Sequence, residues 1–249
     1  MKKWIAFFVI LLLSGFTPEK HAIRIFLAGD STMSIKETRN FPETGWGMPF
    51  VYFWDSTVSV INLAKNGRST KTFINEGLWN KILHDAREND FIIIQFGHND
   101  EVPTKINSYT TPDTFQLNLT RFIHDAKQKK AIPVLCSPVA RRKFTTSGEL
   151  ESTHELYSKL VKEVALREKV TFIDLDQKSQ ALYRQLGVEQ SKLLFVQLKP
   201  GEHPNYPEGK EDNTHFNELG ARLIAQIMLK ELTIAFPALG ERVVKKPAK

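Results

Sequence analysis

Two short polar segments of the chain contain the residue types of a hydrolytic site. Ser31 follows the apolar run Ile23–Ala28 and the pair Gly29-Asp30. Its hydroxyl is therefore expected at the carboxyl end of a strand, with backbone N–H groups nearby to hold an oxyanion. Asp212 stands three residues before His215, which lets the carboxylate bond one imidazole nitrogen while the other faces outward. Taken singly, each segment is more typical of a helix cap than of a catalytic site.

Two further segments offer groups that could bind a developing negative charge. Gly67, in the sequence Asn-Gly-Arg-Ser, is either a plain turn glycine or a point where the backbone must approach a substrate. Asn99, in Gly-His-Asn-Asp after the run Phe91–Phe96, either caps the next segment or belongs to a site. All four segments follow apolar runs or precede the last helical pattern, so they point to one crevice.

The elements that must position these groups alternate between strands and helices. Short apolar runs rich in Ile, Val and Phe are typical of strands buried on both faces of a parallel sheet; they are Ile23–Ala28, Val58–Leu63, Phe91–Phe96, Ile132–Cys136 and Val170–Asp174. Helical patterns cover Thr72–Ala86, Asp113–Gln128, Glu149–Glu168, Asp176–Leu186 and Phe216–Ala235. Asp113, with Gln116 three residues on, is expected to cap the second of them. The alternation predicts one doubly wound α/β domain.

Two long polar loops are candidates for function rather than simple connection. They are Lys36–Phe50 and Lys199–Asp212, and loops of this length usually carry binding or catalytic residues. In a doubly wound sheet, ligands bind beyond the carboxyl ends of the strands. The four polar segments are expected at that edge.

The first twenty residues have the pattern of a secretory signal peptide. Met1–Lys3 is positively charged and Trp4–Leu13 is unbroken apolar sequence, too short for the roughly 20 residues of a membrane span. We expect a signal peptide over residues 1–20, cleaved somewhere between Ser14 and Ala22, and a mature domain over residues 21–249. The protein would then be secreted or periplasmic, the alternative being an uncleaved membrane anchor.

Composition excludes several classes of protein. The 249 residues are 41% hydrophobic and 25% charged, which suits one sizeable core and not a collagen-like or low-complexity chain. Cys136 is the only cysteine, so there is no intramolecular disulfide and no cysteine-based zinc site. The net charge of +6 is too modest to indicate nucleic-acid binding, although it is compatible with an acidic polymer as substrate.

The combined pattern resembles the SGNH (GDSL-type) hydrolases. The four blocks of that superfamily carry a catalytic Ser, an oxyanion Gly, an oxyanion Asn and a D-x-x-H pair in the order seen here. The resemblance implies that Ser31 is the nucleophile, with Asp212 and His215 as orienting acid and base. It also implies an oxyanion hole formed by the Ser31 N–H, the Gly67 N–H and the Asn99 side-chain amide.

Further segments narrow the resemblance to the rhamnogalacturonan acetylesterases of that superfamily. They are Thr32-Met33, where Thr replaces the Leu of the GDSL box, Gly45-Trp46-Gly47, NGRS at 66–69, QFGHND at 95–100 and DNTHF at 212–216. The resemblance implies a flavodoxin-like, three-layer α/β/α fold. It also implies a serine esterase that removes O-acetyl groups from a plant cell-wall polysaccharide, such as rhamnogalacturonan or another pectin, through an acetyl-enzyme intermediate.

No metal or organic cofactor is needed for this reaction. The expected partner is an acetylated polysaccharide or oligosaccharide, without nucleic acid and without stable membrane insertion after signal removal, and we expect a monomer. Another SGNH esterase, such as a xylan acetylesterase, a lipase or a thioesterase, is the alternative within the superfamily.

Two readings from other classes compete with an esterase. A metal-dependent phosphoesterase would draw on the hard ligands of Asp30, His98, Asp100 and His215. The chain has no early D-x-H and no G-x-H-x-H, however, so too few ligands remain for two metals. A sugar-binding module without catalysis would use exposed aromatic side chains, and the candidates for that role, which are also candidates for the core, are Trp46, Trp54, Trp79 and Tyr206.

Three residues near the four segments are candidates for substrate contact. His98, beside Asn99, either touches substrate or hydrogen-bonds within the site. Trp46 either stacks on a sugar face or anchors a packed loop. His203, on the loop that leads to Asp212, either contacts substrate or positions that loop.

Overall fold

The computed structural model describes residues 22–245 of the chain. The expected signal peptide, residues 1–20, lies outside the described residues. Within them, the structure contains no helix with the length and apolar character needed to cross a membrane.

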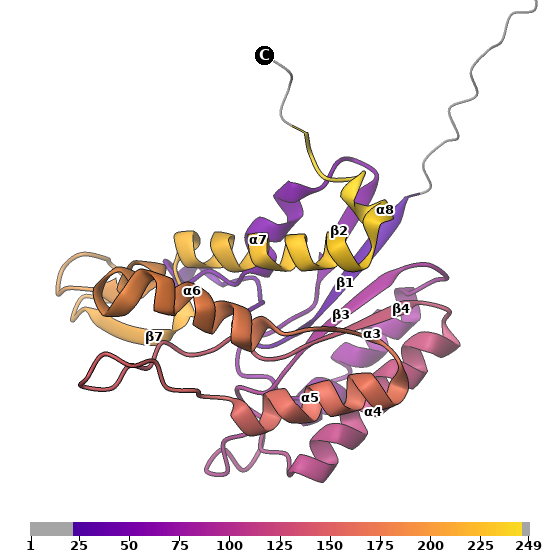
Figure 1. The fold of residues 1–249 in the computed structure, drawn as a ribbon, viewed down its shortest axis with the longest axis horizontal. Helices are drawn as coiled ribbons and strands as arrows, with labels where there is room; N and C mark the ends of the chain where they lie inside the picture. The colour runs from indigo at the N-terminus through magenta and orange to yellow at the C-terminus, as the bar shows by residue number, and fades with distance from the viewer. Residues whose placement is uncertain (1–21, 246–249) are drawn as a thin grey trace, which may run out of the picture.

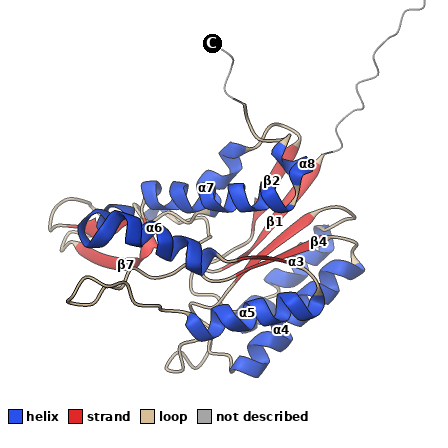
Figure 2. Cartoon of the chain, viewed as in Figure 1, coloured by secondary structure: helices blue, strands red, loops and turns tan. Residues whose placement is uncertain are grey.

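A five-stranded parallel sheet forms the centre of the molecule (Figures 1 and 2). Its order is β2-β1-β3-β4-β5, the flavodoxin-like order of a doubly wound fold, as predicted. The bounds are β1 Ile23–Gly29, β2 Val58–Asn62, β3 Phe91–Gln95, β4 Ile132–Cys136 and β5 Thr171–Ile173. Side chains along β1 alternate between two cores, because Ile25 and Leu27 face one and Phe26 and Ala28 the other.

Helices cover both faces of the sheet (Figure 2). One core lies under α2 Thr70–Asn75, α3 Leu78–Asp85, α4 Pro112–Gln128 and α5 Glu155–Glu168. The other lies under α1 Gly47–Phe50, α6 Leu175–Gln190, α7 Glu218–Ala235 and α8 Pro237–Gly240. Single 3-10 turns complete the helical elements: η1 Thr38–Asn40, η2 Val51–Phe53 and η3 Ser191–Leu194.

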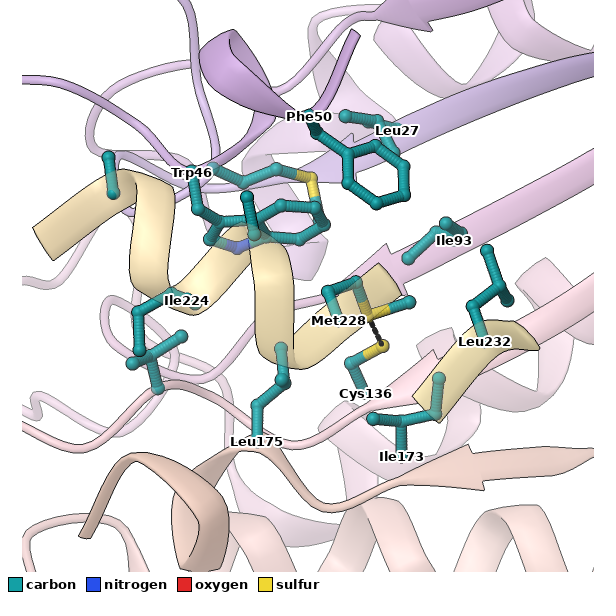
Figure 3. Packing of buried hydrophobic residues seen from close by; sticks show 14 of the residues in the cluster. Leu27, Trp46, Phe50, Ile93, Cys136, Ile173, Leu175, Ile224, Met228 and Leu232 are labelled. Carbon is teal, nitrogen blue, oxygen red and sulfur yellow. Dashed lines mark hydrogen bonds between the residues drawn. The ribbon is translucent and has the colours of Figure 1, made fainter. Parts of the chain in front are cut away.

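The core between the sheet and α7 contains the single cysteine (Figure 3). Met228, fully buried on α7, places its sulfur 3.9 Å from the Cys136 Sγ on β4. The Cys136 thiol is buried and unbonded to any other cysteine, and burial raises its pKa far above the ordinary range. It is an inert core group.

Several predicted helices differ from the structure at their ends. The pattern over 72–86 forms two helices, because Gly77 adopts a left-handed conformation with φ +71° between them. The cap of α4 is Thr111, whose hydroxyl accepts from the Thr114 N–H at 3.3 Å, and not Asp113. α5 begins at residue 155 rather than 149, and α6 continues to residue 190 past a non-helical Gly187.

A second, two-stranded antiparallel sheet was not predicted. It pairs β6 Phe195–Leu198 with β7 Lys210–Phe216, and α7 begins after β7 at residue 218. β7 contains both Asp212 and His215, so these residues stand on a strand and not in a loop before the helix. The sequence KEDNTHF gives no strand signal, since only its last residue is apolar and buried.

Candidate active site

The structure brings Ser31, His215 and Asp212 into one line of hydrogen bonds. His215 Nε2 lies 3.0 Å from Ser31 Oγ, and His215 Nδ1 lies 2.8 Å from Asp212 Oδ2. Ser31 follows β1 at the carboxyl edge of the parallel sheet, whereas the other two residues come from β7. These distances are those of a nucleophile bonded to a base that is oriented by an acid.

Backbone N–H groups fix the Asp212 carboxylate. Its Oδ1 accepts from the N–H groups of Thr214 and His215, both at 2.8 Å. Burial alone would raise the pKa of Asp212, but the hydrogen bond and charge of His215, together with these N–H groups, hold it well below the ordinary value. The carboxylate therefore stays ionised beside the imidazole throughout the working pH range.

Three potential oxyanion donors follow the carboxyl ends of three adjacent strands, β2, β1 and β3. Among the described residues, the Ser31 and Gly67 N–H groups have no intramolecular acceptor. Gly67 has φ +75°, and a Cβ built there would meet nothing within 4 Å, so the space before its backbone is open. Asn99 Nδ2 donates one hydrogen to the Arg68 carbonyl at 3.0 Å, which leaves the second hydrogen of the amide available.

Lys105 and Asp100 fix the positions of the segments that carry these donors. Lys105 Nζ donates to Asn99 Oδ1 at 3.0 Å, which fixes the orientation of the amide. Asp100 Oδ1 accepts from the backbone and hydroxyl of Thr70 at 2.9 and 2.6 Å and from the Thr110 hydroxyl at 2.7 Å. Burial raises the pKa of Asp100 to about 7 against these hydrogen bonds. Asp100 thus ties the loop after β3 to the start of α2, next to the Gly67 turn.

The Thr that replaces Leu in the GDSL box belongs to a buried polar chain. Its hydroxyl donates to Asp30 Oδ1 at 2.8 Å and accepts from Gln95 Nε2 at 2.6 Å. Gln95 Oε1 in turn accepts from Trp46 Nε1 at 2.7 Å. Thr32 can make both bonds and Leu cannot, so the substitution joins the nucleophile turn to β3 and to the loop that carries Trp46.

The three candidates for substrate contact lie in different surroundings. Trp46 is fully buried, so of its two predicted roles the structure supports the anchor of a packed loop and contradicts stacking on a sugar face. His98 is 3% exposed and its ring packs against His154 at 4.2 Å between centroids. Burial and the nearby His154 and Arg141 hold the pKa of His98 well below its ordinary value, which favours the neutral ring. Within the described residues, neither of its ring nitrogens has a hydrogen-bond partner.

His203 alone of the three lines an open hollow. The hollow has a volume of about 410 Å³ and its wall includes Thr44, Met48, Tyr52 and His203. Tyr52 is 74% exposed there. Because the Thr44 N–H donates to the carbonyl of Phe216 at 2.8 Å, the hollow lies close to β7, the strand that contains Asp212 and His215. Trp54 and Trp79, by contrast, are buried in the two cores.

A row of alternating charges beside β7 could not be found from the sequence. Lys210 Nζ lies 2.6 Å from Glu43 Oε1 and 3.4 Å from Asp212 Oδ2. Glu43 Oε2 lies 3.7 Å from Lys36 Nζ. Lys36, Glu43 and Lys210 belong to no motif, and Lys210 lies far in sequence from the other two. Only the approach of the loop at 36–50 to β7 brings them together.

The hard ligands considered for a phosphoesterase do not form one metal cluster. Among residues 22–245, the one group of three side chains close enough to share an ion is Glu43, Asp212 and His215. The Lys210 ammonium already contacts the carboxylates of Glu43 and Asp212 in this group. Asp30 and Asp100 instead use one oxygen each on threonine hydroxyls and N–H groups.

With this geometry in place, the chain can be assigned to a family. Residues 27–223 match the GDSL-like Lipase/Acylhydrolase family, and the protein belongs to it; the matched span contains all five residues of the predicted triad and oxyanion hole. The chain is 40% identical to rhamnogalacturonan acetylesterase RhgT of Bacillus subtilis over 230 residues, 92% of this chain and 98% of that one. It is 34% identical to the probable rhamnogalacturonan acetylesterase YesY of the same organism over 227 residues, 90% and 99% of the two chains. The protein is a carboxylic ester hydrolase.

Solved structures share the fold. The crystal structure of the Bacillus subtilis protein YXIM superposes with a TM-score of 0.74 at 26% identity, covering 88% of this chain and 58% of that one. Axe2, an acetylxylan esterase from Geobacillus stearothermophilus, superposes with a TM-score of 0.61 at 14% identity, covering 86% and 96%. The predicted single, doubly wound α/β domain is confirmed.

Proposed function

We propose that the protein removes O-acetyl groups from rhamnogalacturonan or a related pectic polysaccharide, outside the cytoplasm. The observation that carries the chemistry is the unbroken line from Ser31 Oγ through His215 to Asp212, at 3.0 and 2.8 Å. The acetyl group and the polymer are supported by the two Bacillus relatives, which match nearly end to end and are named for this substrate. Export is supported by the charged and apolar pattern of residues 1–20.

In the first half of the reaction Ser31 Oγ attacks the acetyl carbonyl carbon. His215 Nε2 takes the hydroxyl proton as the C–O bond forms, and Asp212 stabilises the resulting imidazolium. The carbonyl oxygen becomes an oxyanion that accepts from the N–H groups of Ser31 and Gly67 and from the Asn99 amide. His215 then gives its proton to the sugar oxygen, the bond from that oxygen to the acetyl carbon breaks, and the sugar hydroxyl leaves.

In the second half, water replaces the sugar. His215 Nε2 takes a proton from the water as its oxygen attacks the acetyl-Ser31 carbonyl, and the same three donors hold the second oxyanion. The proton passes to Ser31 Oγ as the acyl bond breaks, so acetate leaves and the free enzyme returns. Every proton moves through His215.

An acetyl group is small, so discrimination must come from the sugar side. A hollow of about 420 Å³ is lined by Arg141, Arg142 and Lys143 together with Asn213 and Thr214, directly before His215. Arg141 pairs with Glu101, and Lys143 pairs with Glu151. The Arg142 side chain donates its hydrogen bonds to uncharged groups of Ser191, Asn213 and Val188. The negative charges of Glu189 and Glu211 also act on Arg142, so the hollow carries no excess of positive charge. Its cations nevertheless offer hydrogen-bond donors beside β7 to the uronic-acid carboxylates of a polymer.

Acetate release from a panel of acetylated polysaccharides tests both parts of the proposal. We expect release from acetylated rhamnogalacturonan above that from acetylated xylan or homogalacturonan, and short p-nitrophenyl esters turned over faster than long ones. Ser31→Ala should lower kcat on the order of 10³-fold or more with the fold intact. A preference for xylan or for long acyl chains would overturn the substrate assignment, and an active Ser31→Ala would overturn the nucleophile.

A further inference from the structure

Lys36 is a buried cation directly behind the nucleophile. It lies in the loop between β1 and η1, and its side chain is 0% exposed. Its Nζ donates to the Ser31 carbonyl at 2.5 Å and to Asn66 Oδ1 at 2.8 Å, with Glu43 Oε2 at 3.7 Å. Lysine is almost never fully buried, because an ammonium removed from water is costly unless it is well paired. Because burying this ammonium is costly, we expect Lys36 to have a specific structural or functional role.

The two acceptors belong to the two segments that supply backbone oxyanion donors. One is the carbonyl of Ser31 itself. The other is the side chain of Asn66, the residue directly before Gly67. Ser34 Oγ makes the same bridge without a charge, since it donates to Asn66 Oδ1 at 2.6 Å and approaches the Ser31 carbonyl at 3.4 Å. Two adjacent side chains thus tie the nucleophile turn to the glycine turn.

We propose that Lys36 is a positioning residue, whose ammonium holds the Ser31 turn and the Asn66-Gly67 turn at the separation at which their N–H groups converge on one carbonyl oxygen. The proposal rests on the proposed function of this site. Lys36 does not touch the substrate; it acts through the backbone of Ser31 and the side chain of Asn66. A preorganised hole lowers the barrier because its donors need no rearrangement as charge develops.

The charge of Lys36 is essential to this role. A bond from an ammonium to a carbonyl is roughly twice as strong as one from a neutral donor. Burial holds the pKa of Lys36 down to about 8, although the negative charges of Glu43, Asp30 and Asp212 around it favour the ammonium. These carboxylates come from the loop before α1, the end of β1 and β7, and Glu43 is shared with Lys210. As pH rises through about 8, the ammonium is lost and the clamp weakens.

The test is the pH dependence of kcat for acetate release by wild type and by matched variants. Wild-type kcat should fall above about pH 8. Lys36→Met should lower kcat at pH 7 by roughly 10- to 100-fold with KM nearly unchanged, and its remaining activity should lack the alkaline fall. Ser34→Ala, which removes the uncharged bridge between the same acceptors, should lower kcat less and keep the alkaline fall. Lys162→Met on the exposed face of α5 is the control and should match wild type.

Either of two results would overturn the proposal: kcat of Lys36→Met within twofold of wild type at pH 7, or an alkaline fall that persists unchanged in that variant. If Lys36→Met does not fold, Lys36→Arg decides, because a guanidinium stays charged throughout the pH range of the assay. The alkaline fall should then disappear, and its persistence would contradict the role of Lys36. Wild-type acetate release at pH 7, lost in Ser31→Ala, separates this result from a failure of the proposed function.

Discussion

The parallel sheet and the β6–β7 sheet each hold part of the site, and they hold it differently. The parallel sheet presents Ser31, Gly67 and Asn99 from the ends of strands that lie in the core, and every residue of β3 is buried. β7 presents Asp212 and His215 from a two-stranded sheet in which only the last residue of that strand is buried. A two-stranded sheet is marginal by itself. The strands of the nucleophile side are therefore positioned by core packing, with polar bonds such as those of Lys36 fixing the turns at their ends. The strand of the base side depends mainly on specific local bonds.

The bonds that hold the β6–β7 sheet come from both flanks. The Asn217 side chain donates to the carbonyls of Leu193 and Phe195 at 2.9 and 3.0 Å, at the start of α7. A Cβ at Gly220 would lie 2.0 Å from the Leu194 carbonyl oxygen, so glycine is required for α7 to approach η3 so closely. On the other flank stands the charge row through Lys210. Removing such bonds should affect catalysis before it affects folding.

Among variants that test the difference between the two sheets, Asp212→Asn should lower kcat the most. The amide favours the wrong tautomer of His215 and no longer stabilises the imidazolium, so kcat should fall roughly 10³- to 10⁴-fold. The acid limb of the profile of kcat/KM against pH should move to lower pH, because a neutral amide favours the cation less. An unmoved limb would contradict the role of Asp212.

Asn99→Ala should have the next largest effect, on the side of the parallel sheet. It removes an oxyanion donor that acts as charge develops, so kcat should fall roughly 10²- to 10³-fold with little change in KM. The acid limb should stay in place, because the base side is untouched. A limb that moves here and not in Asp212→Asn would reverse the assignment of the two regions.

Lys210→Met should lower kcat less than the two preceding variants, and it should move the acid limb in the opposite direction to Asp212→Asn. The variant loses a positive charge beside Asp212 and leaves Lys36 as the cation paired with Glu43, and the loss of a nearby positive charge favours the imidazolium of His215. The acid limb should therefore move to higher pH, with kcat lowered roughly 10-fold or less at pH 7. Adding Glu43→Gln to the variant should restore the limb. A limb that moves to lower pH would contradict the charge row.

Met228→Ala should have the smallest effect on rate and a clear one on stability. It empties a fully buried position on α7 beside Cys136, at a cost of about 2–5 kcal/mol in the free energy of unfolding. Urea denaturation measures that loss, and kcat well below the melting temperature should be unchanged. Ile234→Ala, 64% exposed on the same helix, is the control and should stay within about 0.5 kcal/mol. A large loss of kcat would mean that α7 packing sets the β6–β7 geometry.

The difference between the buried parallel sheet and the polar β6–β7 sheet also explains which elements could be predicted from the sequence. The apolar runs gave the strands of the parallel sheet to within two residues, because burial on both faces leaves a continuous apolar signal. β7 was missed because its residues are polar and pair with only one strand. The spacing of Asp212 and His215 was nevertheless informative, since their bond is local. Lys36, Glu43 and Lys210 were missed because tertiary packing alone joins them.

The core position of Cys136 has a practical consequence for spectroscopy. Thiol-directed probes react with the thiolate, and this thiol is 1% exposed with its pKa raised by burial. The native chain therefore behaves toward a maleimide at neutral pH as a protein without cysteine. A cysteine placed at the exposed Glu211 on β7 should take a single label. A fluorophore or spin label at that position would report directly on the motion of the strand that carries the base.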